Sequence, residues 1–109
     1  MSQHYFHTVH QGEPITVVLG WDRALGRFFM IVERQHPKPD QDDYLYSNLA
    51  ESEPDRPHLS YFTRKLDELG IQLPAGMVEQ VYLDPVRHTA NLVVTHRADG
   101  CFHGRATPG

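Results

Sequence analysis

The chain has 109 residues, of which 39% are hydrophobic and 22% charged, a composition that fits one folded domain and excludes a wholly disordered chain. Cys101 is the only cysteine, so an internal disulfide and a zinc site made of several thiolates from one chain are both excluded. The sequence contains no apolar run of about 18 residues, the length needed to span a membrane. Its first residues also lack the pattern of a secretory signal. We therefore expect a cytoplasmic protein that does not contact membranes.

The formal net charge of −4 comes from 14 acidic and 10 basic residues and is concentrated in one segment. Residues 36–58 contain six acidic and two basic side chains, which leaves eight of each sign in the rest of the chain. A nucleic-acid-binding protein needs a basic face to neutralise phosphates, so we expect no direct contact with nucleic acid. If charge selects a partner, that partner is a protein with a basic surface.

Three strands are predicted in the first third of the chain, at 5–10, 15–21 and 28–33, where aromatic and β-branched residues dominate each run. Turn-forming residues separate them, at 11–14 and 22–26. Short connections favour antiparallel neighbours, so these runs predict a three-stranded meander.

The acidic segment 36–58 contains four prolines, which interrupt continuous secondary structure, so we expect a proline-rich loop. Within it, the aromatic and aliphatic run 44–49 predicts a short edge strand or a segment docked on the body of the domain.

Two helices are predicted after the loop. Apolar residues recur at helical spacing over 59–69, and Gly70 is placed to end that helix. A shorter helix is predicted to begin near Pro74 and to end at Asp84, because the residue before a proline avoids helical angles.

A last strand is predicted at 89–96, and residues 101–109 show no periodicity and are expected to form a flexible tail. Together these elements predict an α+β fold: an antiparallel sheet of three to five strands with two helices packed on one face. The expected organisation is a single domain over residues 1–100.

The strands at 15–21 and 28–33 carry apolar residues on both faces, whereas a sheet with one wet face alternates more cleanly. Two short helices cover only one face of a small sheet. The other face is expected to be covered by loop and tail of the same chain, by a second copy in a homodimer, or by a different protein.

Eight histidines suggest metal binding or pH sensing. His4, His7 and His10 recur every third residue, but in a strand the middle side chain points away from the other two, so we predict no metal site there. A histidine-based metal-binding or pH-responsive module remains an alternative, since an unperturbed imidazole titrates near pH ~6.5.

No catalytic residue or cofactor is predicted. Cys101 lies beside glycine in the expected tail with His103 nearby, the serines lack a nucleophile-elbow motif, and no phosphate-binding glycine loop is present. An enzyme remains open only if distant residues such as His88, His96 or Asp22 converge on one pocket.

The string Gly20-Trp21-Asp22-Arg23, followed by Phe28-Phe29, is the most distinctive of the sequence. With the run 44–49 and the helix that ends at Gly70, it resembles short bacterial proteins to which no activity is attached, so the resemblance implies no functional residue. Trp21 is interpreted either as a core anchor or as an exposed binding residue.

The leading hypothesis is a small non-enzymatic interaction module, a regulator or inhibitor that docks on a basic protein through the acidic loop and an apolar sheet face. A nucleic-acid mimic is a special case of it, because clustered acids imitate phosphates. The predicted partner-binding residues are Trp21, Asp42, Asp43, Tyr44 and Tyr46.

Overall fold

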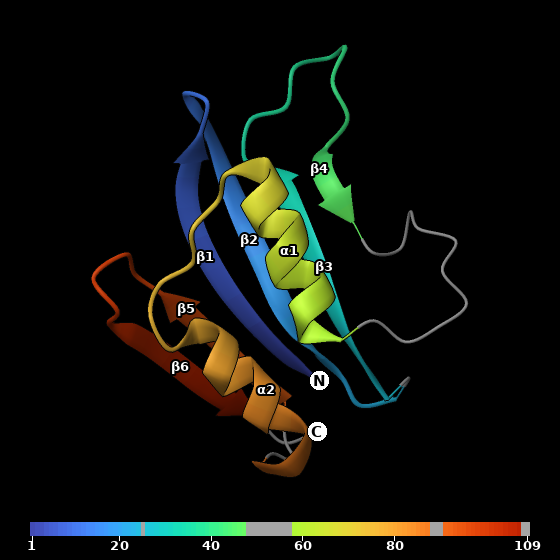
Figure 1. Ribbon diagram of the computed structural model, residues 1–109, viewed down its shortest axis with the longest axis vertical. Coiled ribbons are helices and arrows are strands. Elements are labelled where there is room, and N and C mark those ends of the chain that lie inside the picture. The colour runs from blue at the N-terminus through green and yellow to red at the C-terminus, as the bar shows by residue number, and fades with distance from the viewer. Residues whose placement is uncertain (25, 48–57, 88–90, 108–109) are drawn as a thin grey trace.

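The computed structural model describes residues 1–24, 26–47, 58–87 and 91–107. Six strands form one sheet, and two helices lie together on one side of it (Figure 1). In chain order the elements are β1 (Ser2–His10), β2 (Glu13–Asp22), β3 (Arg27–Arg34), β4 (Tyr44–Ser47), α1 (Leu59–Leu69), α2 (Met77–Arg87), β5 (Asn91–His96) and β6 (Phe102–Thr107).

The strand order is β4-β3-β2-β1-β5-β6, and β1 and β5 are parallel while every other neighbouring pair is antiparallel. The prediction of a purely antiparallel sheet of three to five strands is therefore wrong. The N-terminal meander is present, but the chain then passes through both helices before β5 begins beside the start of β1. There the Leu92 amide donates to the Met1 carbonyl at 3.0 Å, so β5 runs in the same direction as β1.

The sixth strand forms in the segment that was expected to be a flexible tail. A tight turn after β5 reverses the chain, with the Arg97 amide donating to the Cys101 carbonyl at 2.8 Å and Gly100 at a φ of 90°. β6 then pairs antiparallel with β5, from His96 opposite Phe102 to Asn91 opposite Thr107. The expectation of a tail failed because the sequence of β6 does not alternate, and only pairing with β5 makes it a strand.

The first helix agrees with its prediction. Leu59, Phe62 and Leu66 are its buried residues, and Gly70 ends it in the left-handed conformation with a φ of 76°. The Ile71 amide then donates back to the Leu66 carbonyl at 2.9 Å, and the Ile71 side chain is buried in the core, as is common after a glycine-terminated helix.

The second helix differs from its prediction at both ends. It begins at Met77, with Pro74 outside, and it continues through Pro85 to Arg87. Pro85 has no N–H to donate to the Val81 carbonyl, which normally ends a helix. Because Val81 and Asp84 are both buried against the sheet, tertiary contacts hold this last turn in helical form despite its local preference.

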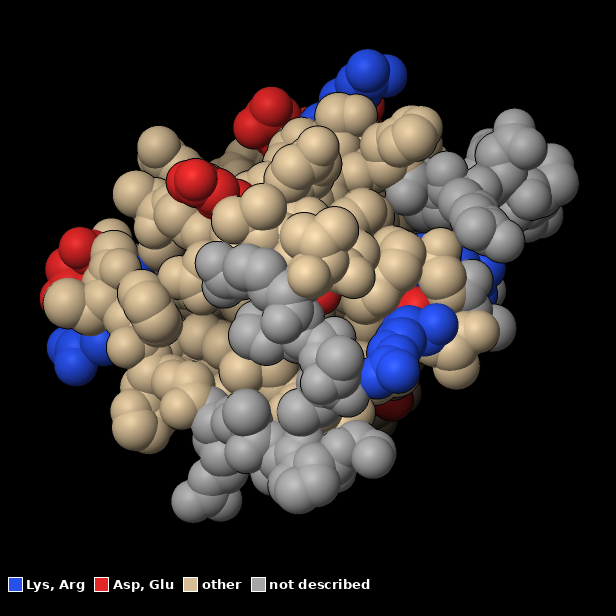
Figure 2. Space-filling model, turned by 90° about the horizontal axis from the view of Figure 1, so that it is seen from below, with Lys and Arg blue, Asp and Glu red and all other residues tan. Residues whose placement is uncertain are grey.

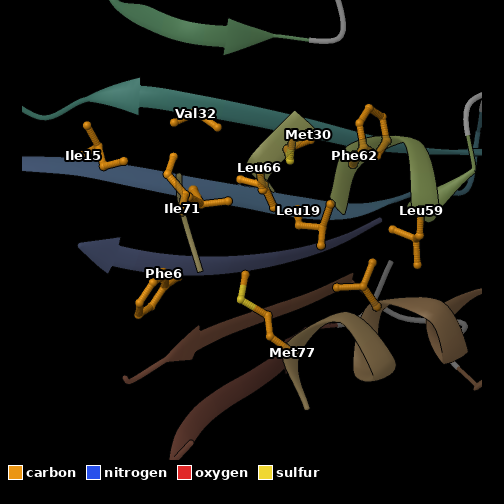
Figure 3. Packing of buried hydrophobic residues seen from close by; sticks show 12 residues of the cluster. Phe6, Ile15, Leu19, Met30, Val32, Leu59, Phe62, Leu66, Ile71 and Met77 are labelled. Carbon is orange, nitrogen blue, oxygen red and sulfur yellow. The ribbon is translucent and has the colours of Figure 1, made fainter. Parts of the chain in front are cut away.

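The core lies between the two helices and one face of the sheet, which we call the inner face (Figure 3). Alternate residues of the three central strands face α1 and α2, as expected from strand geometry. The core cluster consists of Phe6, Ile15, Val17, Leu19, Met30, Val32, Leu59, Phe62, Leu66, Ile71, Met77 and Val81.

The opposite side of the sheet, which we call the outer face, carries no helix from the described residues (Figure 1). Paired residues share a face, so cross-strand register places three rows of side chains on it. The central row is Thr95–Tyr5–Val18–Ile31–Ser47, with Val93–Gln3–Gly20–Phe29 on one side of it and His7–Thr16–Glu33–Tyr44 on the other.

Gly20 allows the ring of Phe29 to lie across the sheet. A Cβ atom at position 20 would lie 2.7 Å from Phe29 Cζ and would also overlap the Ser2 carbonyl oxygen. The glycine is therefore required by close approach of neighbouring groups, not by its own backbone angles.

The Gly20→Ala variant is expected to lower the free energy of unfolding by about 2 kcal/mol, because the added methyl group overlaps backbone and ring atoms. Urea denaturation followed by circular dichroism measures it. The control is Gly12→Ala, where nothing lies within 4 Å and only the positive φ of 79° opposes a side chain, at about 1 kcal/mol. Equal losses in the two variants would contradict this account.

Candidate functional site

Three polar side chains are buried on the inner face and joined by hydrogen bonds. His4 Nε2 lies 2.7 Å from Asp84 Oδ2, and His4 Nδ1 lies 2.9 Å from His96 Nε2. The exposed fractions of His4, Asp84 and His96 are 0%, 1% and 3%. These residues come from β1, α2 and β5, so the hydrogen-bonded chain, which we call the array, links three elements far apart in sequence.

Aromatic rings enclose the His96 end of the array. The rings of His4 and His96 are stacked, with centroids 5.1 Å apart, and Phe102 on the edge strand β6 packs on the other side of His96 at 5.8 Å. Phe102 is 59% exposed. It therefore separates His96 from solvent at that side.

Hydrogen-bond chemistry limits where the protons of the array lie. An ionised Asp84 accepts, so His4 Nε2 donates to it. The 2.9 Å contact between the two imidazoles then needs one proton, which either His4 Nδ1 or His96 Nε2 carries. If both nitrogens carried a proton, two donors would face each other and this bond would be lost.

The surroundings hold the pKa of His96 down to about 4, well below the ordinary value of 6.5. Burial is the largest cause, because it penalises the charged imidazolium. Repulsion from His4 adds to it, and attraction from Asp84 offsets part of it. His96 is therefore neutral at pH 7, which is compatible with a single proton in its contact with His4.

The array is not arranged as a metal site. His4 uses both ring nitrogens on protein partners, and within the described ranges no group of three or more His, Cys, Asp or Glu could hold a metal ion. His4, His7 and His10 do not converge: His7 Nδ1 lies 2.8 Å from Thr16 Oγ1 on the outer face, and His10 Nε2 lies 2.7 Å from the Leu69 carbonyl oxygen.

The hollows of the described surface lie away from the array. The described part of the surface has shallow hollows at the β1–β2 turn, along β4, and beside Met1 and Asn91, and none of these is lined by an array residue. Of the distant residues considered as a combined site, His96 is in the array, Asp22 lies at the end of β2, and His88 is outside the described residues.

Four of the five predicted partner-binding residues lie together along the edge strand β4. Asp42, Asp43 and Tyr44 are exposed there, and with Tyr46 they line a hollow of about 470 Å³. Arg34 organises this edge, since its Nη1 donates to the Asp42 carbonyl at 2.8 Å. The Tyr46 ring, however, packs edge-on against Phe62 of α1, with centroids 6.4 Å apart, and so faces the core.

Trp21 lies apart from that group. It pairs with Phe28 at the far end of β3, whereas Tyr44 pairs with Glu33, five residues or about 17 Å along the strand. Its ring packs edge-on against Phe28 on the inner face, with centroids 4.8 Å apart. The acidic residues Glu51, Glu53 and Asp55 of the predicted loop lie outside the described residues.

Analysis of the sequence missed the array, although two signals pointed to it. His4 and His96 each continue an apolar inner-face stripe, being two residues from Phe6 and Val94 respectively. Asp84 falls seven residues after Met77 and three after Val81, on the buried stripe of its helix. A titratable residue on a buried stripe needs a partner, but only the fold identifies which one.

Asp84→Ala is expected to lower the free energy of unfolding by about 1–3 kcal/mol, because it removes the acceptor of the His4 Nε2 hydrogen bond and leaves that nitrogen buried without this partner. Chemical denaturation at pH 7 measures the loss. Asp67→Ala, at an exposed position of α1, is the matched control and is expected to change stability by less than about 0.5 kcal/mol. If Asp84→Ala lowered the free energy of unfolding no more than Asp67→Ala does, the contact between Asp84 and His4 would not stabilise the fold.

Stability is also expected to fall in mild acid. Since the folded pKa of His96 is about 4 and the ordinary value is 6.5, the unfolded chain binds the proton first. The stabilisation is complete above pH ~6.5 and is lost as the pH falls toward 4, a decrease of about 3 kcal/mol. Denaturation of wild type and His96→Gln at several pH values tests this, and equal slopes for the two proteins would contradict it.

No protein-family model matches the chain, and neither the curated proteins nor the solved structures contain a significant match. Neither of the two helices within the described ranges has the length and apolar character needed to cross a bilayer.

Proposed function

We propose that this protein is a non-enzymatic interaction module that binds a basic protein partner through the outer face of its sheet and the acidic edge beside it. The observation that carries the proposal is the division of the sheet. Both helices cover the inner face, while the outer face has apolar side chains and, among residues 1–24, 26–47, 58–87 and 91–107, no helix over it (Figure 1).

The apolar part of the outer face is continuous across the central strands. Tyr5, Val18 and Ile31 lie opposite one another on β1, β2 and β3. Phe29 and Val93 extend this patch in the neighbouring row, and Val93 is 41% exposed. Rigid aromatic and aliphatic side chains of this kind form the centre of protein interfaces.

Acidic side chains border one side of the apolar patch. Glu33 lies on the outer face opposite Tyr44, at the edge where Asp42 and Asp43 are exposed. Arg34, which also lies at this edge, is already bound to Glu13, with Nε 3.1 Å from Oε1. Within residues 33–47, the four acidic residues Glu33, Asp40, Asp42 and Asp43 outnumber the remaining cation, Lys38. This edge is therefore negative, which favours a basic partner and accelerates its association at low salt.

The opposite end of the molecule lacks this character. In the described part of the surface seen in Figure 2, side chains of both signs lie in small separate groups without a continuous patch of one sign. We therefore place the contact with a basic partner at the β4 edge. No basic face of the kind needed for nucleic acid is visible at the end of the molecule seen in Figure 2.

To test this, the full chain is immobilised and used to capture proteins from a cell lysate. The affinity of each captured protein is then measured after purification. A basic partner is expected to bind at low salt and more weakly at high salt. The Tyr5→Ser/Ile31→Ser double variant is expected to lower its affinity at least about tenfold, and Asp42→Asn/Asp43→Asn is expected to reduce mainly the salt dependence and the association rate.

The matched control is Tyr82→Ser, which removes a ring that is 66% exposed on α2, away from the outer face. Circular dichroism verifies that all variants are folded. Equal affinity of Tyr82→Ser and the outer-face double variant would contradict the proposal. Light scattering that shows a dimer of this chain, dissociated by the outer-face variant, would also overturn it, because a second copy would then occupy the face.

A further inference from the structure

The β1–β5 pairing divides the molecule into two parts. On one side lies the meander β1–β4, whose core cluster contains buried residues of both α1 and α2, and on the other lies the β5–β6 hairpin (Figure 1). Within the inner face, the array spans this boundary, because His4 and Asp84 belong to the first part and His96 belongs to the second.

We infer that the array is an acid-sensitive link: when both imidazoles are protonated, the β5–β6 hairpin separates from β1 while the meander and both helices stay folded. The inference does not depend on the proposed binding function. It follows from the 2.9 Å contact between His4 Nδ1 and His96 Nε2, which holds only one proton.

The groups that face His96 define the response. From β1 it faces His4, from α2 Asp84, and from β6 the uncharged ring of Phe102. Asp84 can balance the charge of one imidazolium. A second imidazolium in contact with the first has no further carboxylate among these neighbours, so its charge is buried without compensation.

When β5 separates from β1, His96 can take up the second proton in contact with water. Separation of β5 from β1 would expose His96 to water and remove its contact with His4. Because the pKa of His96 is about 4 in the closed state and ordinary when exposed, acid favours the open state. The same step leaves the core cluster in place, because none of the buried residues that make it up belongs to β5 or β6.

Contacts that do not involve the array hold the meander together. Its strands pair over long stretches, and Phe62 and Leu66 of α1 pack in the core with Leu19 and Met30. Proteins open in cooperative units whose stability differs. The part held by the array is the one whose stability depends on His96.

Amide hydrogen exchange on the full chain, corrected for intrinsic rates, tests the link at pH 7 and pH 4.5. Exchange at Leu92, whose amide donates to the Met1 carbonyl, is expected to accelerate about 10- to 100-fold between the two pH values and to stay faster than exchange in β2 and β3, whose amides open only when the whole chain unfolds. In His96→Gln this acceleration is expected to disappear, because glutamine keeps a hydrogen-bonding group and does not titrate. His103→Gln, at an exposed position of β6, is expected to behave as wild type.

Two results would overturn the link. One is loss of protection at the same pH throughout the sheet, which would mean that acid unfolds the molecule as a whole. The other is an unchanged pH dependence in His96→Gln.

If His96→Gln does not fold, ¹⁵N spectra of the imidazoles in wild type replace it. The shared proton is expected at pH 7 and its loss is expected to coincide with the opening of β5. A shared proton that persists after β5 has opened, or disappears while β5 stays protected, would refute the inference.

Discussion

The parallel pairing of β1 with β5 is the constraint on which the rest of the structure depends. It places Ser2, His4 and Phe6 beside Leu92, Val94 and His96, and so extends a four-stranded meander into a six-stranded sheet. It also positions α2 over the same inner face that α1 covers. Without this pairing His96 would not reach His4, and the hydrogen bond between the two imidazoles would not form.

The division of the sheet into two unlike faces follows from the same arrangement. Both helices lie in the chain between β4 and β5, and both return over one side, so the inner face receives the core and the array. The outer face keeps residues that are not polar enough for a fully wet surface, and no helix from the described part of the chain covers them. The acidic β4 edge borders that face because Arg34 turns toward Glu13 and the backbone of the preceding loop, leaving Asp42 and Asp43 exposed.

The sequence predicted the elements whose formation depends on residues close together in the chain. The meander and α1 were recovered because alternation, turn residues and the Gly70 terminus act within a few residues of one another. The pairing of β1 with β5, the continuation of α2 through Pro85 and the formation of β6 depend on contacts across the whole chain, which a propensity does not contain. Of the candidate site, the position of His4, His96 and Asp84 on buried stripes was readable, but their mutual contact was not. Asp42, Asp43 and Tyr44 could be grouped from the sequence because they are consecutive residues. The distance of Trp21 from them could not be predicted, because it depends on the strand register.

The position of β1 inside the sheet has a consequence for folding. β2 pairs with β1 through a tight turn, but the other edge of β1 must wait until residues about 90 positions later have been synthesised, since Ser2 pairs with Leu92. Contacts this distant in sequence slow folding. Until β5 arrives, β1 presents unpaired backbone groups that can pair with another chain. The vulnerable species in production of this protein is therefore the nascent or truncated meander, and its aggregation is expected to be governed by how fast β5 reaches β1 rather than by the stability of the finished sheet.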